Sequence, residues 1–129
     1  MTDEQTLLES PLFQATADLA FDSIMVTEAT DDRGASRIVF VNPSFTEMTG
    51  YTADDVMGQT PGMLQGPDTD PAELSRLADD LKNGRTFHGR AINYRKDGTP
   101  FDIEWKVTPI TRNGRATHYL AVQRDRGNH

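Results

Sequence analysis

The 129-residue sequence contains no cysteine. The chain therefore has no disulfide, no cysteine-ligated zinc or iron–sulfur site, no thiol nucleophile and no thiol that could form a covalent adduct with a ligand. Basic residues are also scarce, since 13 Lys and Arg stand against 20 Asp and Glu, for a formal net charge of −7. Nucleic-acid backbones are bound by clustered basic side chains, so this balance predicts no nucleic-acid partner.

Long hydrophobic runs are missing as well. No apolar stretch approaches the roughly 20 residues that a membrane-spanning helix needs. The first twenty residues carry Asp3, Glu4, Glu9 and Asp18, which is not typical of a signal or transit peptide. We therefore expect a cytoplasmic protein with no membrane partner.

Groups for catalysis or metal binding are few. Two of the three histidines, His88 and His118, occupy outward-facing positions of their expected strands. We expect both at the surface, where neither serves as a haem or zinc ligand. The acidic pairs at 54–55 and 79–80 are typical of solvated helix faces. The sequence has no nucleophile–base pair and no phosphate-binding glycine loop, so it predicts neither an enzyme nor a metal site.

What is present is the pattern of one α+β domain. The expected strands are 23–28, 37–41, 86–94, 101–108 and 117–123. The expected helices are 42–50, 52–56 and 71–82, with a turn at 30–34 and irregular backbone over 58–70. This order predicts a five-stranded antiparallel sheet with short helices on one face. Residues 21–126 form the core, 127–129 a tail, and 1–20 a helical flank or cap.

Details of the expected helices can be tested against the structure. Pro11 is expected to interrupt the flank, whose packing residues are Leu7, Leu8, Leu12 and Phe13. In the helix over 71–82, leucines at 74, 77 and 81 form the predicted buried stripe.

Strand alternation places small and amide side chains on the inner face of the sheet. Gly89 and Ala91 indicate room beside the sheet, because small residues leave volume to be filled. Asn93 and Gln123 present carboxamides at the edge of that room. Each carries a donor and an acceptor, which match the alternating N–H and C=O groups of a flavin ring edge. The alternative is that both amides bond neighbouring backbone at the strand ends.

Four segments carry a family resemblance. They are Asn42 to Tyr51, Gly58 to Asp70, Asn93-Tyr94-Arg95-Lys96-Asp97-Gly98-Thr99-Pro100-Phe101 and Gln123-Arg124-Asp125. With these segments the chain resembles the flavin-binding LOV branch of PAS domains from about Ile38 to Asp125. The resemblance implies the PAS fold and a sensory or signalling role.

The resemblance also implies a cofactor and a site. The cofactor is FMN, with riboflavin or FAD as alternatives. Asn93 and Gln123 hold the edge of the flavin ring, and Gln65 lies along the flavin side chain. The candidate cofactor-binding residues are Asn93, Gln123, Gln65, Thr60, Pro61, Ile103, Ala91 and Leu64.

Several positions depart from the family pattern. Pro61 stands where the family has its photoreactive cysteine, and Thr60 replaces an asparagine beside it. Gly62 and Ala78 replace two arginines that bind the flavin phosphate, and Ile103 replaces a second ring-edge asparagine. We therefore expect a sensor of light or redox state that binds flavin non-covalently and forms no cysteinyl adduct.

The alternative is a flavin-free PAS module that dimerises and relays a signal. Apolar residues on the outer face of the sheet favour an interface there, namely Ile92, Tyr94, Leu120 and Val122. We expect a homodimer through this face and the N-terminal helix; a monomer that covers its own sheet is the competing outcome. The sequence does not identify an effector domain or partner.

Overall fold

The computed structural model describes residues 8–30 and 36–129. Its helices are α2 (Pro11–Leu19), α3 (Pro43–Thr49), α4 (Ala53–Val56) and α5 (Pro71–Lys82), with a 3-10 turn, η1 (Pro61–Leu64). Its strands are β1 (Ser23–Ala29), β2 (Ser36–Val41), β3 (Phe87–Tyr94), β4 (Pro100–Arg112) and β5 (Arg115–Asn128). Leu7 and most of the predicted turn over 30–34 lie outside the described residues.

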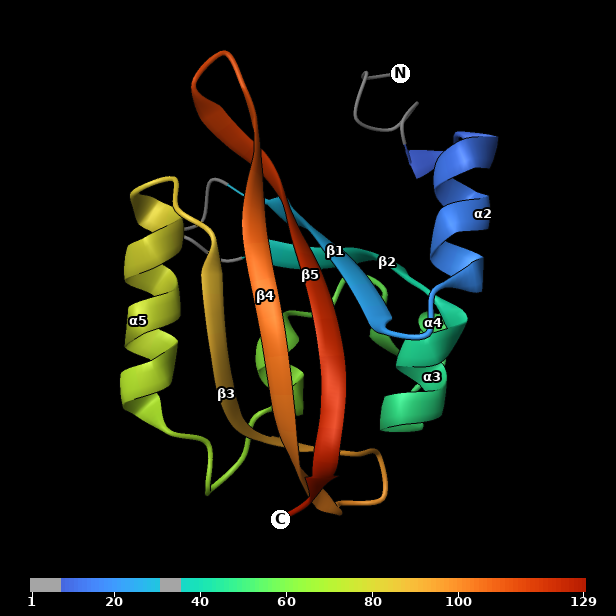
Figure 1. Ribbon diagram of the computed structural model, residues 1–129, viewed down its shortest axis with the longest axis vertical. Coiled ribbons are helices and arrows are strands. Elements are labelled where there is room, and N and C mark those ends of the chain that lie inside the picture. Colours follow the sequence, from blue (N-terminus) through green and yellow to red (C-terminus); the bar gives the residue numbers. More distant parts are fainter. Residues whose placement is uncertain (1–7, 31–35) are drawn as a thin grey trace.

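The five strands form one antiparallel sheet in the order β2-β1-β5-β4-β3. The predicted α+β class and the five-stranded antiparallel sheet are confirmed. Figure 1 shows α5 beside β3 at one side of the sheet and α2 at the other. No helix in the described ranges is long and apolar enough to cross a membrane.

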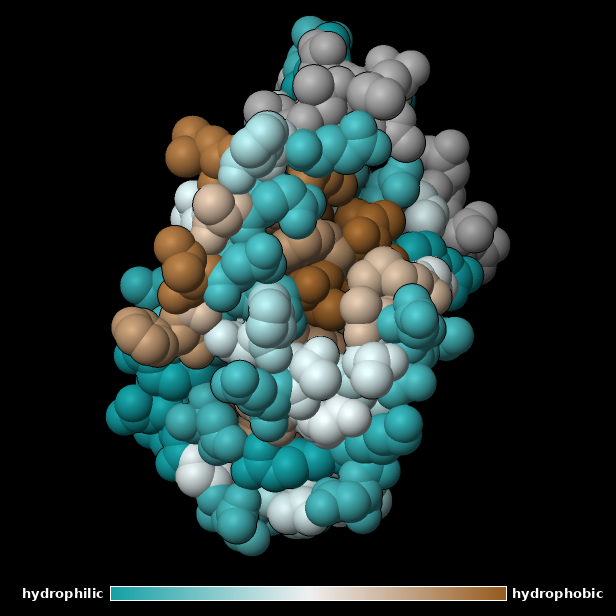
Figure 2. Space-filling view, turned by 90° about the vertical axis from the view of Figure 1, so that its right-hand side faces the viewer, coloured by the Kyte–Doolittle hydropathy of each residue, from teal (hydrophilic) through white to brown (hydrophobic). Residues whose placement is uncertain are grey.

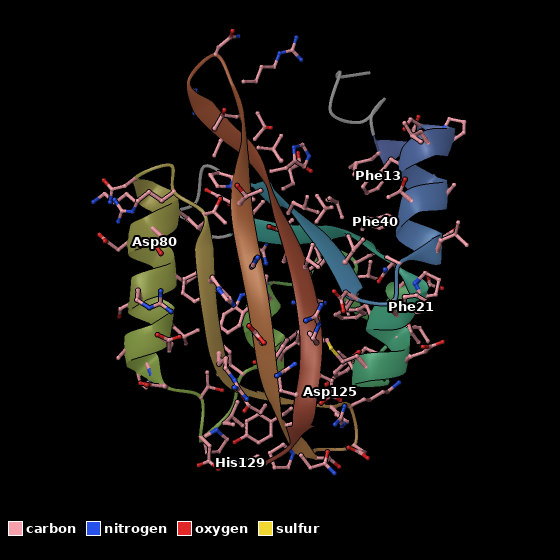
Figure 3. The ribbon with its side chains drawn as sticks, in the orientation of Figure 1. Phe13, Phe21, Phe40, Asp80, Asp125 and His129 are labelled. Atoms are coloured by element: carbon pink, nitrogen blue, oxygen red, sulfur yellow. The ribbon has the colours of Figure 1, made fainter. Side chains whose placement is uncertain are left out.

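Helix α2 starts at Pro11 and differs from its prediction in the packing of one leucine. Pro11 occupies its first turn and Ser10 caps it, because the Ser10 hydroxyl accepts a 3.1 Å hydrogen bond from Phe13 N. Leu8 is helical, the helix is broken at Glu9 and Ser10, and α2 begins at Pro11, so the flank is interrupted where this was expected. Proline suits the new first turn, where its missing N–H is not needed. Leu12 is 80% exposed instead of packed. Phe13 does pack, because its ring centroid lies 5.0 Å from that of Phe40. Both side chains are labelled in Figure 3, between α2 and the sheet.

Asn42 joins α2 to the sheet and to α3. Its side-chain oxygen accepts hydrogen bonds from Ile24 N and Phe45 N, and its amide nitrogen donates to the carbonyls of Ala17 and Asp22. The side chain is buried and all four bonds are 2.8–3.1 Å long. A buried amide with this many partners fixes the end of the flank against the core.

Helix α5 has the predicted bounds because a capping residue and a proline mark its start. Asp70 caps it, with a carboxylate oxygen 2.9 Å from Ala72 N, and Pro71 stands in its first turn. Its leucine stripe is half-buried rather than buried, since Leu74, Leu77 and Leu81 line a cavity.

Strands β4 and β5 are longer than predicted and run to a tight turn at Asn113 and Gly114. Both turn residues have positive φ, +53° and +79°, which suits a two-residue hairpin. Backbone pairing continues as far as Arg112 with Arg115. Among the added residues Thr111, Arg112 and Arg115 are polar and exposed, so hydrophobic alternation gave no sign of these positions.

The inner face of the sheet holds the core, as alternation predicted. Phe101, Ile103 and Val107 are at most 6% exposed, and Phe45 and Phe87 are fully buried. The prediction for His118 is wrong: it is buried, because α2 lies over this part of the outer face.

Candidate functional site

A cavity of about 600 Å³ lies between α5, η1 and the inner face of the sheet. Its walls are mainly apolar. The lining residues are Met25, Thr27, Ser36, Pro61, Gln65, Leu74, Leu77, Ala78, Leu81, Lys82, Trp105, Val107, Tyr119, Ala121 and Gln123. Concave, largely apolar spaces of this size with a few convergent polar groups are typical of cofactor sites.

Strand register orders the cavity from one end to the other. Gln123 marks one end of the cavity, where it pairs with Ser23 of β1 and with Trp105 of β4. Tyr119 lies four residues earlier on β5 and pairs with Thr27. Four strand residues cover about 13 Å, so the cavity is elongated along the strands.

Three of the eight candidate residues line this cavity: Pro61, Gln65 and Gln123. The other five lie outside its lining. Leu64, Ala91 and Ile103 are buried in the core at 2%, 8% and 1% exposure. Thr60 and Asn93 are half-buried.

The carboxamides are largely unpartnered within the described residues. Gln123 is 5% exposed, and its Oε1 accepts a 2.8 Å hydrogen bond from the Ser23 hydroxyl. Neither its Nε2 nor the side-chain amides of Gln65 and Asn93 bond to any described residue. The alternative in which Asn93 and Gln123 bond strand backbone therefore has no such bond to support it. The side chain of Gln123 is buried, whereas Asn93 is half-buried and Gln65 is exposed. The Gln123 amide is therefore the one best suited to a polar ligand edge.

The space beside Gly89 is already occupied. A Cβ atom at Gly89 would lie 2.5 Å from Glu73 Oε2 and 2.6 Å from an Nη of Arg76. Arg76 and Glu73 form a double hydrogen bond, 2.9 Å on each arm, and Arg76 also donates to the carbonyl of His88. The interpretation of Gly89 as open ligand space is wrong, because the glycine admits this ion pair from α5.

The loop that carries Gln65 is fastened to β3. The Tyr94 hydroxyl accepts a 2.9 Å hydrogen bond from Asp68 N, and its ring packs against Gly66. Thr69 accepts from Gly66 N and donates to the carbonyl of Ile92. These bonds hold the loop that follows Gln65 against β3, and they place Tyr94 against this loop.

Two lining residues had little or no role in the sequence-based site. Trp105 lines the cavity and tilts against Phe87, with ring centroids 5.0 Å apart. Lys82 lies one turn beyond Ala78 on α5, and helical spacing from Leu74 and Ala78 was the signal that could have found it. In residues 8–30 and 36–129, no three His, Asp or Glu side chains gather to hold a metal.

The model of the PAS domain family matches residues 22–127. The LOV domain of the blue-light activated histidine kinase from Erythrobacter litoralis EL346 superposes with a TM-score of 0.75 at 30% identity. That match covers 82% of this chain and 96% of the other. This chain belongs to the LOV branch of the PAS domain family.

Other relatives of this LOV domain are parts of longer proteins. Phototropin-2 of rice (Oryza sativa subsp. japonica) is 42% identical over 102 residues, which are 78% of this chain and 11% of the phototropin. The blue-light-activated histidine kinase of Brucella ovis is 38% identical over 89 residues, 68% of this chain and 18% of the kinase. An RNA-binding light-oxygen-voltage receptor superposes with a TM-score of 0.82 at 32% identity, covering 93% of this chain and 34% of the receptor. The LOV domain thus spans less than a fifth of these two curated relatives.

Proposed function

We propose that this LOV domain binds a flavin non-covalently in the cavity beneath α5 and senses light or redox state without a cysteine adduct. The observation that carries the proposal is the Gln123 carboxamide. It is buried, it lines the cavity, and only its oxygen has a hydrogen-bond partner among the described residues. Its Nε2 is a donor suited to a carbonyl on the edge of a flat ring.

The rest of the lining fits the same ligand. Leu77, Val107 and Trp105 offer apolar and aromatic surface for a planar ring, and Gln65 offers a second amide for a polar side chain. Asn93 stays in the proposal because its amide has no partner in the described chain. Thr60, Ile103, Ala91 and Leu64 would support the residues that touch the ligand.

A bound flavin supplies blue-light absorption and the capacity to accept electrons. The chain's own residues would orient it through Gln123 and Gln65 and keep water away with the apolar wall. Since the sequence contains no cysteine, any response uses no bond to sulfur. The Ser23 hydroxyl, bonded to Gln123, would carry a change at the cavity amide to the start of β1.

The single tryptophan gives a direct test. Trp105 is the only tryptophan in the chain and lines the cavity. Purified protein should be titrated with riboflavin, FMN and FAD while tryptophan emission is followed, with N-acetyl-tryptophanamide correcting for absorbed light. We expect saturable quenching by at least one flavin and co-elution of that flavin on gel filtration. If none of the three quenches or co-elutes, the flavin proposal is overturned and the relay module remains.

A second role, dimerisation and signal relay, is favoured by an apolar groove between α2 and the outer face of the sheet. The groove has a volume of about 440 Å³. Its apolar lining residues are Leu8, Leu12, Phe13, Val26, Ile110 and Leu120. Figure 2 shows hydrophobic side chains gathered in the upper half of the face that carries α2 and hydrophilic ones below.

Exposure supports a homodimer through this groove. In the groove Leu12 is 80% exposed and Ile110 is 38% exposed. Val122 does not line the groove but is also 38% exposed, two residues beyond Leu120 on β5. Clustered apolar groups of this kind are typical of interfaces. We include Leu120 and Val122 in the proposed interface and leave out Tyr94, because its ring packs against Gly66.

A further inference from the structure

Lys82 is the one charged residue among the described residues that line the cavity. We propose that Lys82 binds the phosphate of the cavity ligand and so makes the site selective for a phosphorylated flavin, FMN, over riboflavin. This inference rests on the proposed flavin function and assigns one residue within it.

The direction of α5 places Lys82 away from the Gln123 end. Arg76 donates to the carbonyl of His88, so the first half of the helix lies against the start of β3. Gly89 follows there and pairs with Trp105, which in turn pairs with Gln123. Lys82 is six residues beyond Arg76, about 9 Å further along the helix axis. A ligand with its ring edge at Gln123 would extend its tail toward Lys82.

Lys82 is not engaged by the acidic residues on its own helix. Asp79 and Asp80 each form a 3.1 Å ion pair with Arg85, and Asp80 also lies 4.0 Å from Arg76. Lys82 has no ion pair with any residue of the described ranges. Its flexible stem can cover apolar lining while the ammonium group meets an anion at the mouth.

The other basic residue of this helix, Arg76, already has partners within the protein. The Arg76 guanidinium bonds Glu73 with both arms and stacks 4.5 Å above the ring of Phe87. It also does not line the cavity. The hydroxyl of Ser36 and the amide of Gln65 do line it and can donate hydrogen bonds to phosphate oxygens.

A purely structural role for Lys82 is the alternative to be separated. It stands in the last turn of α5, where a positive charge favours the helix dipole. If Lys82 only stabilises the helix, its substitution should lower the stability of the protein and should affect FMN and riboflavin binding equally. A phosphate-binding role predicts a loss of affinity for FMN alone.

The test compares FMN with riboflavin in Lys82→Gln and in Lys106→Gln. Lys106 is exposed on the opposite face of the sheet, so its substitution makes the same charge change away from the cavity. Binding is followed by quenching of Trp105 at low salt, and thermal unfolding reports the fold. We expect the unsubstituted protein to prefer FMN by about fivefold, a preference that an exposed ion pair can supply. K82Q should abolish the preference and leave riboflavin affinity unchanged, while K106Q should keep it.

Each other outcome has a defined meaning. Equal affinity for FMN and riboflavin in the unsubstituted protein, or equal weakening of both by K82Q, would overturn the assignment of Lys82 while flavin binding stands. Failure of the unsubstituted protein to bind FMN or riboflavin would overturn the assignment of Lys82, and failure to bind FAD as well would overturn the proposed function itself.

Discussion

The Ser23 hydroxyl donates a 2.8 Å hydrogen bond to Gln123 Oε1 across the β1–β5 pair, and both side chains are buried. Gln123 lines the cavity, and Ser23 begins β1, four residues after α2 ends at Leu19. This hydrogen bond therefore links the cavity amide to the first residue of the strand that follows the N-terminal helix.

Removing this hydroxyl tests how much the Gln123 amide depends on it. Ser23→Ala leaves a buried carboxamide oxygen without its donor, which should lower the free energy of unfolding by about 1–3 kcal/mol. Urea denaturation followed by Trp105 emission measures the change. Ser75→Ala, at an exposed position on α5, is the matched control and should stay within about 0.5 kcal/mol of the parent. Equal stabilities for S23A and the parent would show that the bond contributes nothing.

The parts of the fold that follow from local chemistry were predictable from the sequence. Helix α5 begins at Pro71 because Asp70 caps it, and α3 ends where Gly50 takes a φ of +81°. The alternation of apolar and polar residues along β4 was also visible within that segment alone. It predicted an inward-facing apolar set, and Phe101, Ile103 and Val107 of that set are buried.

Features that depend on contacts between distant segments were not predictable. Strand alternation alone predicts His118 at the surface, because it contains no information that α2 covers this position. The sequence predicts open space beside Gly89, because it does not show that Glu73 and Arg76 of α5 fill that space. The extent of the cavity likewise depends on how α5 lies along β3, which no pattern within either segment encodes.

Gly66 is expected to tolerate no side chain while Tyr94 is present. A Cβ atom at Gly66 would lie no more than 2.8 Å from three atoms of the Tyr94 ring. Gly66→Ala should therefore lower the free energy of unfolding by about 1–3 kcal/mol through overpacking. In a Tyr94→Ala background the same change should cost much less, and a double-mutant cycle measures this coupling.

Gly62 provides the control for that cycle. Its Cβ would meet only Thr60 Oγ1, at 3.6 Å, so Gly62→Ala should be close to neutral. If G66A costs the same with and without the Tyr94 ring, the packing explanation fails.

Glu104 makes stability depend on pH in a defined window. Its hydrogen bond to His88, 2.6 Å long, lowers the pKa of the Glu104 carboxyl below its ordinary value of 4.5, with Arg126 nearby adding to the effect. Because the pKa is lower in the folded state, the stabilisation is present above pH 4.5. It is lost as the pH falls below 4.5 and through the folded-state pKa.

His88→Ala should raise the pKa of Glu104 toward 4.5 and flatten the loss of stability below that pH. Carbon-detected NMR titration of the Glu104 carboxyl measures the pKa, and urea unfolding at several pH values measures the slope. His129→Ala removes a histidine that pairs with Asp68 instead, so it should leave Glu104 unchanged. An unaltered Glu104 titration in H88A would assign the lowered pKa to the arginines alone.

The proposed dimer makes a prediction at the edge of the apolar groove. Ile110 lines the groove and is 38% exposed, so Ile110→Glu should place a charge in the interface at little cost to the monomer. We expect a homodimer for the parent protein and a monomer for I110E in sedimentation velocity, with thermal unfolding confirming that both are folded. Thr111→Glu, exposed at the next position of β4, adds the same charge and should remain dimeric. A parent protein that sediments as a monomer would instead mean that α2 covers the face within one chain, and the relay role would then need another surface.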